Sequence, residues 1–121
     1  MSVRNFRDLI VWQRAMELAE EVYGLSAGFP ADERFALTNQ VRRAAVSIPS
    51  NIAEGEGRFS KQDFRRFLSI AMGSLREVET QLELAVRLKY ASTENAARCM
   101  ELADEVGRLL RGLAKSLETE D

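Results

Sequence analysis

The chain contains no histidine and only one cysteine. Histidine is the commonest general base, the commonest metal ligand and the usual partner of a serine or cysteine nucleophile, so its absence removes most catalytic designs. A lone Cys99 forms neither an intramolecular disulfide nor a thiolate cluster. We expect Cys99 to pack as a small apolar residue in a reduced protein.

Long apolar runs are also missing, and no segment approaches the roughly 20 residues that a membrane span needs. The N-terminus has no apolar stretch of the secretory type. We therefore expect a cytoplasmic protein that does not bind membranes. The formal net charge of -2 argues against a generally basic nucleic-acid binder.

Only two prolines interrupt the 121 residues, and good helix formers fill the stretches between turn signals. Apolar residues recur in steps of three and four, which predicts helices at about 8–27, 31–54, 61–90 and 93–118. Short connections between long helices favour antiparallel neighbours. The sequence thus predicts one all-α domain over residues 1–121, an antiparallel up-down-up-down four-helix bundle.

Several residues mark the ends and contacts of these helices. Gly28 suits a left-handed C-terminal cap, and Ser60 suits an N-cap. Pro49 should kink its helix or start a new helical piece. Gly73 and Ser74 lie inside the strongest heptad pattern, so we interpret them as a close-contact point that faces the helix at 31–54.

The helix expected at 8–27 has an apolar arc of roughly 200°, wider than a one-sided surface helix needs. One small bundle cannot cover that arc together with the arc of the helix at 61–90. We therefore predict an oligomer interface that contains Val11, Trp12, Ala15, Leu18, Val22, Ile70, Leu84 and Leu88.

Polar side chains follow one face of the helix at 31–54. They can form a structural network that joins neighbouring helices and satisfies the backbone around Pro49, made of Gln40, Ser47, Asn51 and Glu54. They can instead form a binding site, in which Arg43 and Asn51 contact phosphate or base. We favour the structural network.

Basic residues outnumber acidic ones by six to three between positions 42 and 66. This local excess predicts an RNA- or DNA-binding patch made of Arg42, Arg43, Arg58, Lys61, Arg65 and Arg66. Phe59 is the one nearby aromatic outside the core register, so it could stack on a base. A solvated charged face is the ordinary alternative.

The acidic residues on the last two helices do not predict a metal centre. A di-metal site of the ferritin type needs a Glu-x-x-His motif, which a chain without histidine lacks. No phosphate-binding loop, dinucleotide fingerprint or nucleophile elbow is present either. We therefore expect no catalytic residue, no metal and no cofactor.

Three stretches carry a family resemblance: DLIVWQRA at 8–15; FP at 29–30 with QVRRAAVSIPSNIAEG at 40–55; and FLSIAMGSLREVETQL at 67–82. They resemble the bacterial four-helix-bundle family whose founding members are encoded in intervening sequences of 23S rRNA genes. Five residues match family motif positions that have no recorded catalytic role, namely Arg42, Arg43, Asn51, Glu54 and Arg58.

The resemblance implies a bundle that assembles into a homopentamer. It also implies kinship with the accessory protein of diversity-generating retroelements, which binds nucleic acid and a reverse transcriptase. Most members of the family have no established activity. Residues and resemblance together predict a non-enzymatic cytoplasmic assembly protein, with an RNA- or DNA-binding module as the alternative.

Overall fold

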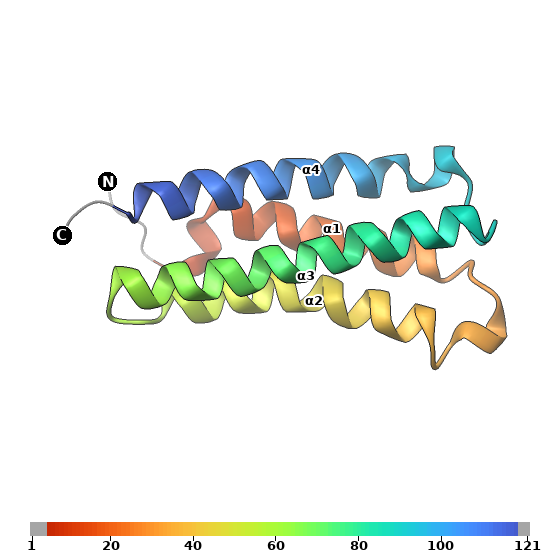
Figure 1. Cartoon of the computed structure of the whole chain (residues 1–121), viewed down its shortest axis with the longest axis horizontal. Coiled ribbons are helices and arrows are strands. Elements are labelled where there is room, and N and C mark those ends of the chain that lie inside the picture. Colours follow the sequence, from red (N-terminus) through yellow and green to blue (C-terminus); the bar gives the residue numbers. More distant parts are fainter. Residues whose placement is uncertain (1–4, 119–121) are drawn as a thin grey trace.

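The computed structural model describes residues 5–118, and this part of the chain folds into four α-helices without a strand. They are α1 (Ile10–Ser26), α2 (Leu37–Glu56), α3 (Lys61–Arg87) and α4 (Thr93–Ser116). Single 3₁₀ turns at Phe6–Asp8 and Ala31–Glu33 precede α1 and α2. Each helix runs opposite to the one before it (Figure 1), so the predicted all-α four-helix bundle is confirmed.

The helices form a square in which each contacts its two neighbours in the order α1, α2, α3, α4, and α4 closes against α1. The core lies along the centre of this square. Its largest fully buried side chains are Leu18, Ile48, Ile52, Leu68, Leu75, Leu82, Leu102, Leu110, Val22, Val41, Val78 and Val106. No helix among residues 5–118 is long and apolar enough to cross a membrane.

Serine side chains begin the two C-terminal helices. The hydroxyl of Ser60 accepts a hydrogen bond of 3.0 Å from the backbone N–H of Asp63, as predicted. The hydroxyl of Ser92 does the same for Asn95 at the start of α4. Pro49 lies inside α2, which continues through it as a single helix.

The start of α2 differs from the prediction, because the helix begins at Leu37 and not near residue 31. The Glu33 carboxylate accepts hydrogen bonds from the backbone N–H of Leu37 at 3.1 Å and from the hydroxyl of Tyr90 at 2.8 Å. Glu33 therefore caps α2 from outside the helix and ties its start to the turn between α3 and α4.

Two predictions about glycine were wrong. Within the described residues no glycine has a positive φ, so Gly28 is not a left-handed cap. The backbone N–H groups of Gly28 and Phe29 instead donate to the carbonyls of Leu25 and Ser26, three residues earlier, and these bonds close the end of α1. Gly73 is exposed, with open space where a side chain would be, so of the two predicted contact residues only Ser74 reaches α2.

Lys89 adopts the left-handed conformation, with φ 66°, at the end of α3. The backbone N–H of Tyr90 reaches back to the carbonyl of Ala85 at 2.9 Å, and that of Lys89 to the carbonyl of Val86 at 3.0 Å. This pair of bonds is the Schellman pattern, which usually carries a glycine at the position of Lys89.

Candidate functional site

A groove of about 650 Å³ runs along the surface between α1 and α2. Its walls are largely apolar, and three of its large side chains, Met16, Tyr23 and Val46, are 38%, 45% and 42% exposed. The ring of Pro49 is part of the wall. The groove is lined by Trp12, Met16, Ala19, Glu20, Tyr23, Val46, Pro49, Ser50 and Ala53.

The predicted oligomer interface divides into two sets. Val11, Ala15, Leu18 and Val22 are buried in the core of one protomer, so they are unavailable to a second copy and their assignment to an interface was wrong. Helix α1 is contacted by both α2 and α4, and together these helices cover more of its wide apolar arc than we predicted from the sequence. Trp12 lies in the groove.

The other predicted interface residues are exposed apolar side chains on one face of α3 and at its C-cap, with Ile70 separated from Leu84 and Leu88 by the polar Glu77 and Gln81. Ile70, Leu84 and Leu88 are 42%, 45% and 47% exposed, and their spacing places them on one face of the helix. We call these three exposed residues the α3 stripe. The molecule thus has two exposed apolar surfaces, one between α1 and α2 and one on α3. The α2 side of the groove was not predicted, because Val46 and Pro49 are not part of the apolar stripe that periodicity assigns to this helix.

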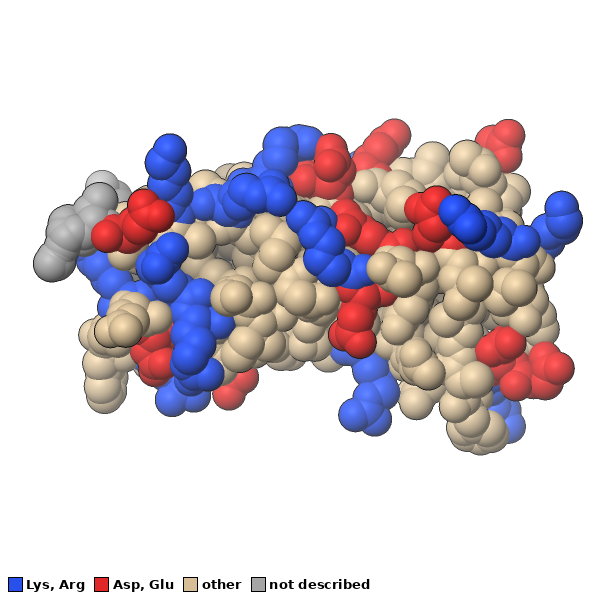
Figure 2. Space-filling view, viewed as in Figure 1, with Lys and Arg blue, Asp and Glu red and all other residues tan. Residues whose placement is uncertain are grey.

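A cleft of about 830 Å³ lies between α3 and α4, next to the turn that joins α2 to α3. Figure 2 shows this hollow with lysine and arginine side chains gathered around it. The structure brings two of the predicted basic residues, Arg65 and Arg66, into its wall and adds Arg111 from α4, which the sequence argument missed. The full lining is Ser60, Gln62, Asp63, Arg65, Arg66, Leu68, Ser69, Met72, Leu110, Arg111 and Ala114.

Local contacts hold several of these cations. The Arg65 Nε donates to the backbone carbonyl of Ala114 at 3.0 Å, near the end of α4. The Arg66 Nε pairs with the Asp63 carboxylate at 3.1 Å. The guanidinium groups of Arg58 and Arg66 both lie 4.6 Å from the centre of the Phe67 ring. Cation–π contact therefore orients both groups at this end of the bundle.

Of the remaining predicted basic residues, Arg42 and Arg43 lie away from the cleft, and Lys61 lies at the same end of the bundle as the cleft. The Arg42 side chain donates to the Ser26 hydroxyl at 2.8 Å and to the carbonyl of Tyr23 at 3.2 Å, so it stabilises the C-terminal end of α1. Arg43 lines a small polar pocket between α2 and α3. Lys61 is exposed at the first residue of α3. The structure therefore groups only Arg58, Lys61, Arg65 and Arg66 at one end.

The predicted polar network is partly assembled. The hydroxyls of Ser47 and Ser74 lie 2.8 Å apart across α2 and α3, and the Asn51 amide donates to both the carbonyl and the hydroxyl of Ser47. Gln40 instead accepts a long hydrogen bond of 3.4 Å from Gln81. Glu54 lies 3.9 Å from Arg58 in the next turn.

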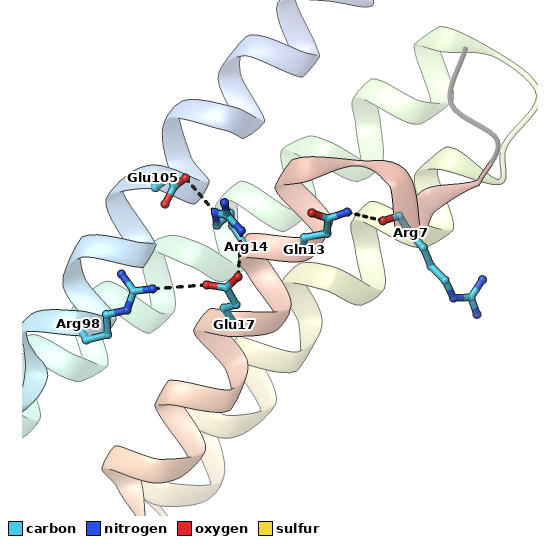
Figure 3. Close-up of polar contacts among 6 residues, drawn as sticks. All are labelled: Arg7, Gln13, Arg14, Glu17, Arg98 and Glu105. Carbon is cyan, nitrogen blue, oxygen red and sulfur yellow. Dashed lines mark hydrogen bonds and ion pairs between the residues drawn. The ribbon is translucent and has the colours of Figure 1, made fainter. Parts of the chain in front are cut away.

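Ion pairs also join α1 to α4, as Figure 3 shows. The Arg14 guanidinium contacts Glu105 on α4 at 3.1 Å and Glu17 at 2.9 Å, and Glu17 is also 3.5 Å from Arg98. These pairs are partly exposed, so each contributes little to stability, on the order of 0–1 kcal/mol. They link the outer faces of α1 and α4.

Cys99 is buried in the core, as its apolar register predicted. Burial, with a smaller contribution from the negative charge of Glu21, raises the pKa of its thiol to about 11. The thiol stays protonated near neutral pH, whereas the thiolate is the reactive form. Cys99 is therefore a packing residue.

Comparisons with known proteins place the chain in a family. A family model described as 23S rRNA-intervening sequence protein matches residues 7–112. A crystal structure of a protein of unknown function from the S23 ribosomal protein family of Bacteroides thetaiotaomicron is 29% identical, with a TM-score of 0.81 over 88% of this chain and 99% of the other. No curated protein matches. The chain therefore belongs to the 23S rRNA-intervening sequence protein family.

Proposed function

We propose that the protein is a non-enzymatic cytoplasmic assembly protein whose copies join into a homo-oligomeric ring. The observation that carries this proposal is the apolar groove between α1 and α2, whose side chains Met16, Tyr23 and Val46 are exposed in a single protomer. Contiguous apolar surface of this kind usually marks a protein interface. A second copy of the chain is the partner that we propose for it.

The position of the second apolar surface favours a ring over a simple dimer. The α3 stripe is on a different helix from the groove, so the two surfaces can belong to one contact between successive copies. A contact that joins different surfaces of two copies is heterologous, and it generates a closed ring when the rotation closes. The family resemblance implies five copies.

A charge in the groove should break this assembly. The Val46 side chain is 42% exposed on the groove side of α2, so Val46→Glu leaves the core of one protomer intact. In the assembly the same carboxylate would be buried without a partner, which is strongly unfavourable. We expect light scattering coupled to size exclusion to find a multimer for the unmodified protein and a folded monomer for Val46→Glu.

Ala97→Glu is the matched control, because Ala97 is an exposed residue of α4 outside both apolar surfaces. It should leave the multimer intact. A monomeric unmodified protein at micromolar concentration would overturn the proposal, and a multimer that tolerates Val46→Glu would remove the groove from it.

Nucleic-acid binding is the second candidate function, and one observation favours it. Phe59 is fully exposed, with a relative exposure of 107%, between the basic residues Arg58 and Lys61. An exposed aromatic ring beside cations is the arrangement that stacks bases and holds phosphate. Binding to labelled RNA should then fall steeply with salt, because phosphate contacts release counterions. No binding at low salt would exclude this candidate.

A further inference from the structure

The strongest feature that the assembly does not use is the cleft between α3 and α4. We propose that this cleft binds single-stranded nucleic acid, with phosphates held by Arg65, Arg66 and Arg111 and a base stacked on Phe59. The inference rests on the second candidate function above and goes further, because it names the site and the strandedness of the ligand.

The charge in the cleft is positive and comes from two helices. Arg65 and Arg66 line the α3 side, and Arg111 lines the α4 side. Arg111 makes no ion pair with any residue between 5 and 118, and neither does Lys115, one turn further along α4. Both cations are therefore available to a phosphate.

The acidic residues near the cleft are already paired. Asp63, the one carboxylate in the lining, lies 3.1 Å from the Arg66 Nε and 3.9 Å from the Arg58 Nε. Glu118 lies 3.8 Å from an Arg65 nitrogen. Each of these contacts is partly exposed, so a phosphate can compete for the same guanidinium groups at little cost.

Part of the cleft floor is apolar, between polar and basic walls. Met72 and Ala114 are partly exposed there, above Leu68 and Leu110, which are buried in the core. A duplex keeps its bases stacked inside and presents only phosphates and groove edges, so it gains nothing from such a surface. A single strand can turn its bases onto apolar and aromatic side chains while its backbone follows the cations. The mixed character of the cleft therefore favours a single strand.

Phe59 supplies the stacking surface. It immediately precedes Ser60, which lines the cleft, and it makes no contribution to the core of the protomer. The neighbouring Phe64 and Phe67 pack inward, and Phe67 is covered by the guanidinium groups of Arg58 and Arg66. Phe59 is thus the aromatic ring at this end that a base can reach.

Fluorescence anisotropy with a labelled single-stranded oligouridylate and a duplex RNA of equal length tests the proposal. We expect the full chain to bind the single strand more tightly. Phe59→Ala should weaken binding of the single strand by about tenfold and leave duplex binding unchanged. Arg111→Ala should weaken both, and should reduce the slope of log affinity against log salt by about 0.7 for the single strand. Both side chains are exposed, so circular dichroism should show unchanged folding.

Arg87→Ala is the matched control, since Arg87 is an exposed arginine of α3 at the opposite end of the helix. It should leave the affinity for the single strand within twofold of the unmodified protein.

If Phe59→Ala and Arg111→Ala bind the single strand as well as Arg87→Ala does, the cleft is not the site. If the chain binds duplex RNA as tightly as the single strand, this inference fails while the second candidate function stands. Absence of binding to either ligand overturns both.

Discussion

Two glycines in helices show how local space decides the role of a residue. Gly55 is buried near the end of α2, where an added Cβ would lie 2.7 Å from the Phe67 Cβ and 2.9 Å from a ring carbon of Phe64. Gly73, inside α3, has nothing within 4 Å of the same position. The first glycine permits close approach of α2 and α3, and the second has no packing role that the structure shows.

Replacing each glycine by alanine should change stability in opposite directions. Gly73→Ala removes the conformational cost of an interior helical glycine and should raise the free energy of unfolding by about 1 kcal/mol. Gly55→Ala forces the α2–α3 contact apart and should lower it by about 1–3 kcal/mol. Urea denaturation monitored by circular dichroism measures both. Equal effects of the two substitutions would contradict this account of Gly55.

At the scale of the helices, periodicity predicted the four elements well and their contacts less well. The starts of α3 and α4 at Ser60 and Ser92 follow from side-chain capping, which is local and can therefore be predicted from the sequence. The cap of α2 comes from Glu33 held by Tyr90, two residues 57 positions apart, and no local pattern encodes such a pair. The basic cleft was half predicted, because Arg111 joins it only through the packing of α4 on α3.

The Glu33 cap should make stability depend on acid pH. The hydrogen bond from the Leu37 N–H, and to a smaller extent that from the Tyr90 hydroxyl, hold the pKa of the Glu33 carboxyl below its ordinary value in the folded protein. A lowered folded pKa gives stability that is present above the unfolded pKa and is lost as pH falls through the folded value. The difference in Tm between the unmodified protein and Glu33→Gln should therefore shrink as the pH falls from neutral through the unfolded pKa and then the folded pKa of Glu33.

Asp32→Asn is the control for this experiment, because it removes the same charge from the neighbouring residue without touching the cap bonds. Tyr90→Phe should move the pKa of Glu33 back toward its ordinary value, since it deletes one donor. A Tm difference for Glu33→Gln that stays constant from neutral to acid pH would show that the carboxylate does not cap α2.

At the scale of the whole molecule, the core is buried while the surface keeps an exposed apolar groove. The wide apolar arc of α1 is mostly covered by α2 and α4, so the exposed remainder is a groove with a second helix as its other wall. Sequence periodicity detects apolar residues but not which neighbour covers them. That is why it placed Val11 and Leu18 at an interface although they are core residues.

Assembly through the groove should make thermal stability depend on protein concentration. Any partner that binds the folded state and not the unfolded chain raises the apparent stability by mass action. The Tm of the unmodified protein should therefore rise with concentration, and the Tm of Val46→Glu should not. Differential scanning fluorimetry across a dilution series measures this, and parallel flat lines for both proteins would argue against the assembly.

The groove and the cleft lie on opposite sides of the square of helices, one between α1 and α2 and the other between α3 and α4. Neither the groove nor the α3 stripe shares a residue with the lining of the cleft, so a ring contact through those two surfaces uses none of the cleft residues. Every subunit added to a ring would then bring one more binding site for the same strand, and a long RNA would bind several clefts at once. Weak capture at one cleft would become durable capture by the whole particle, since linked sites rebind before the strand diffuses away.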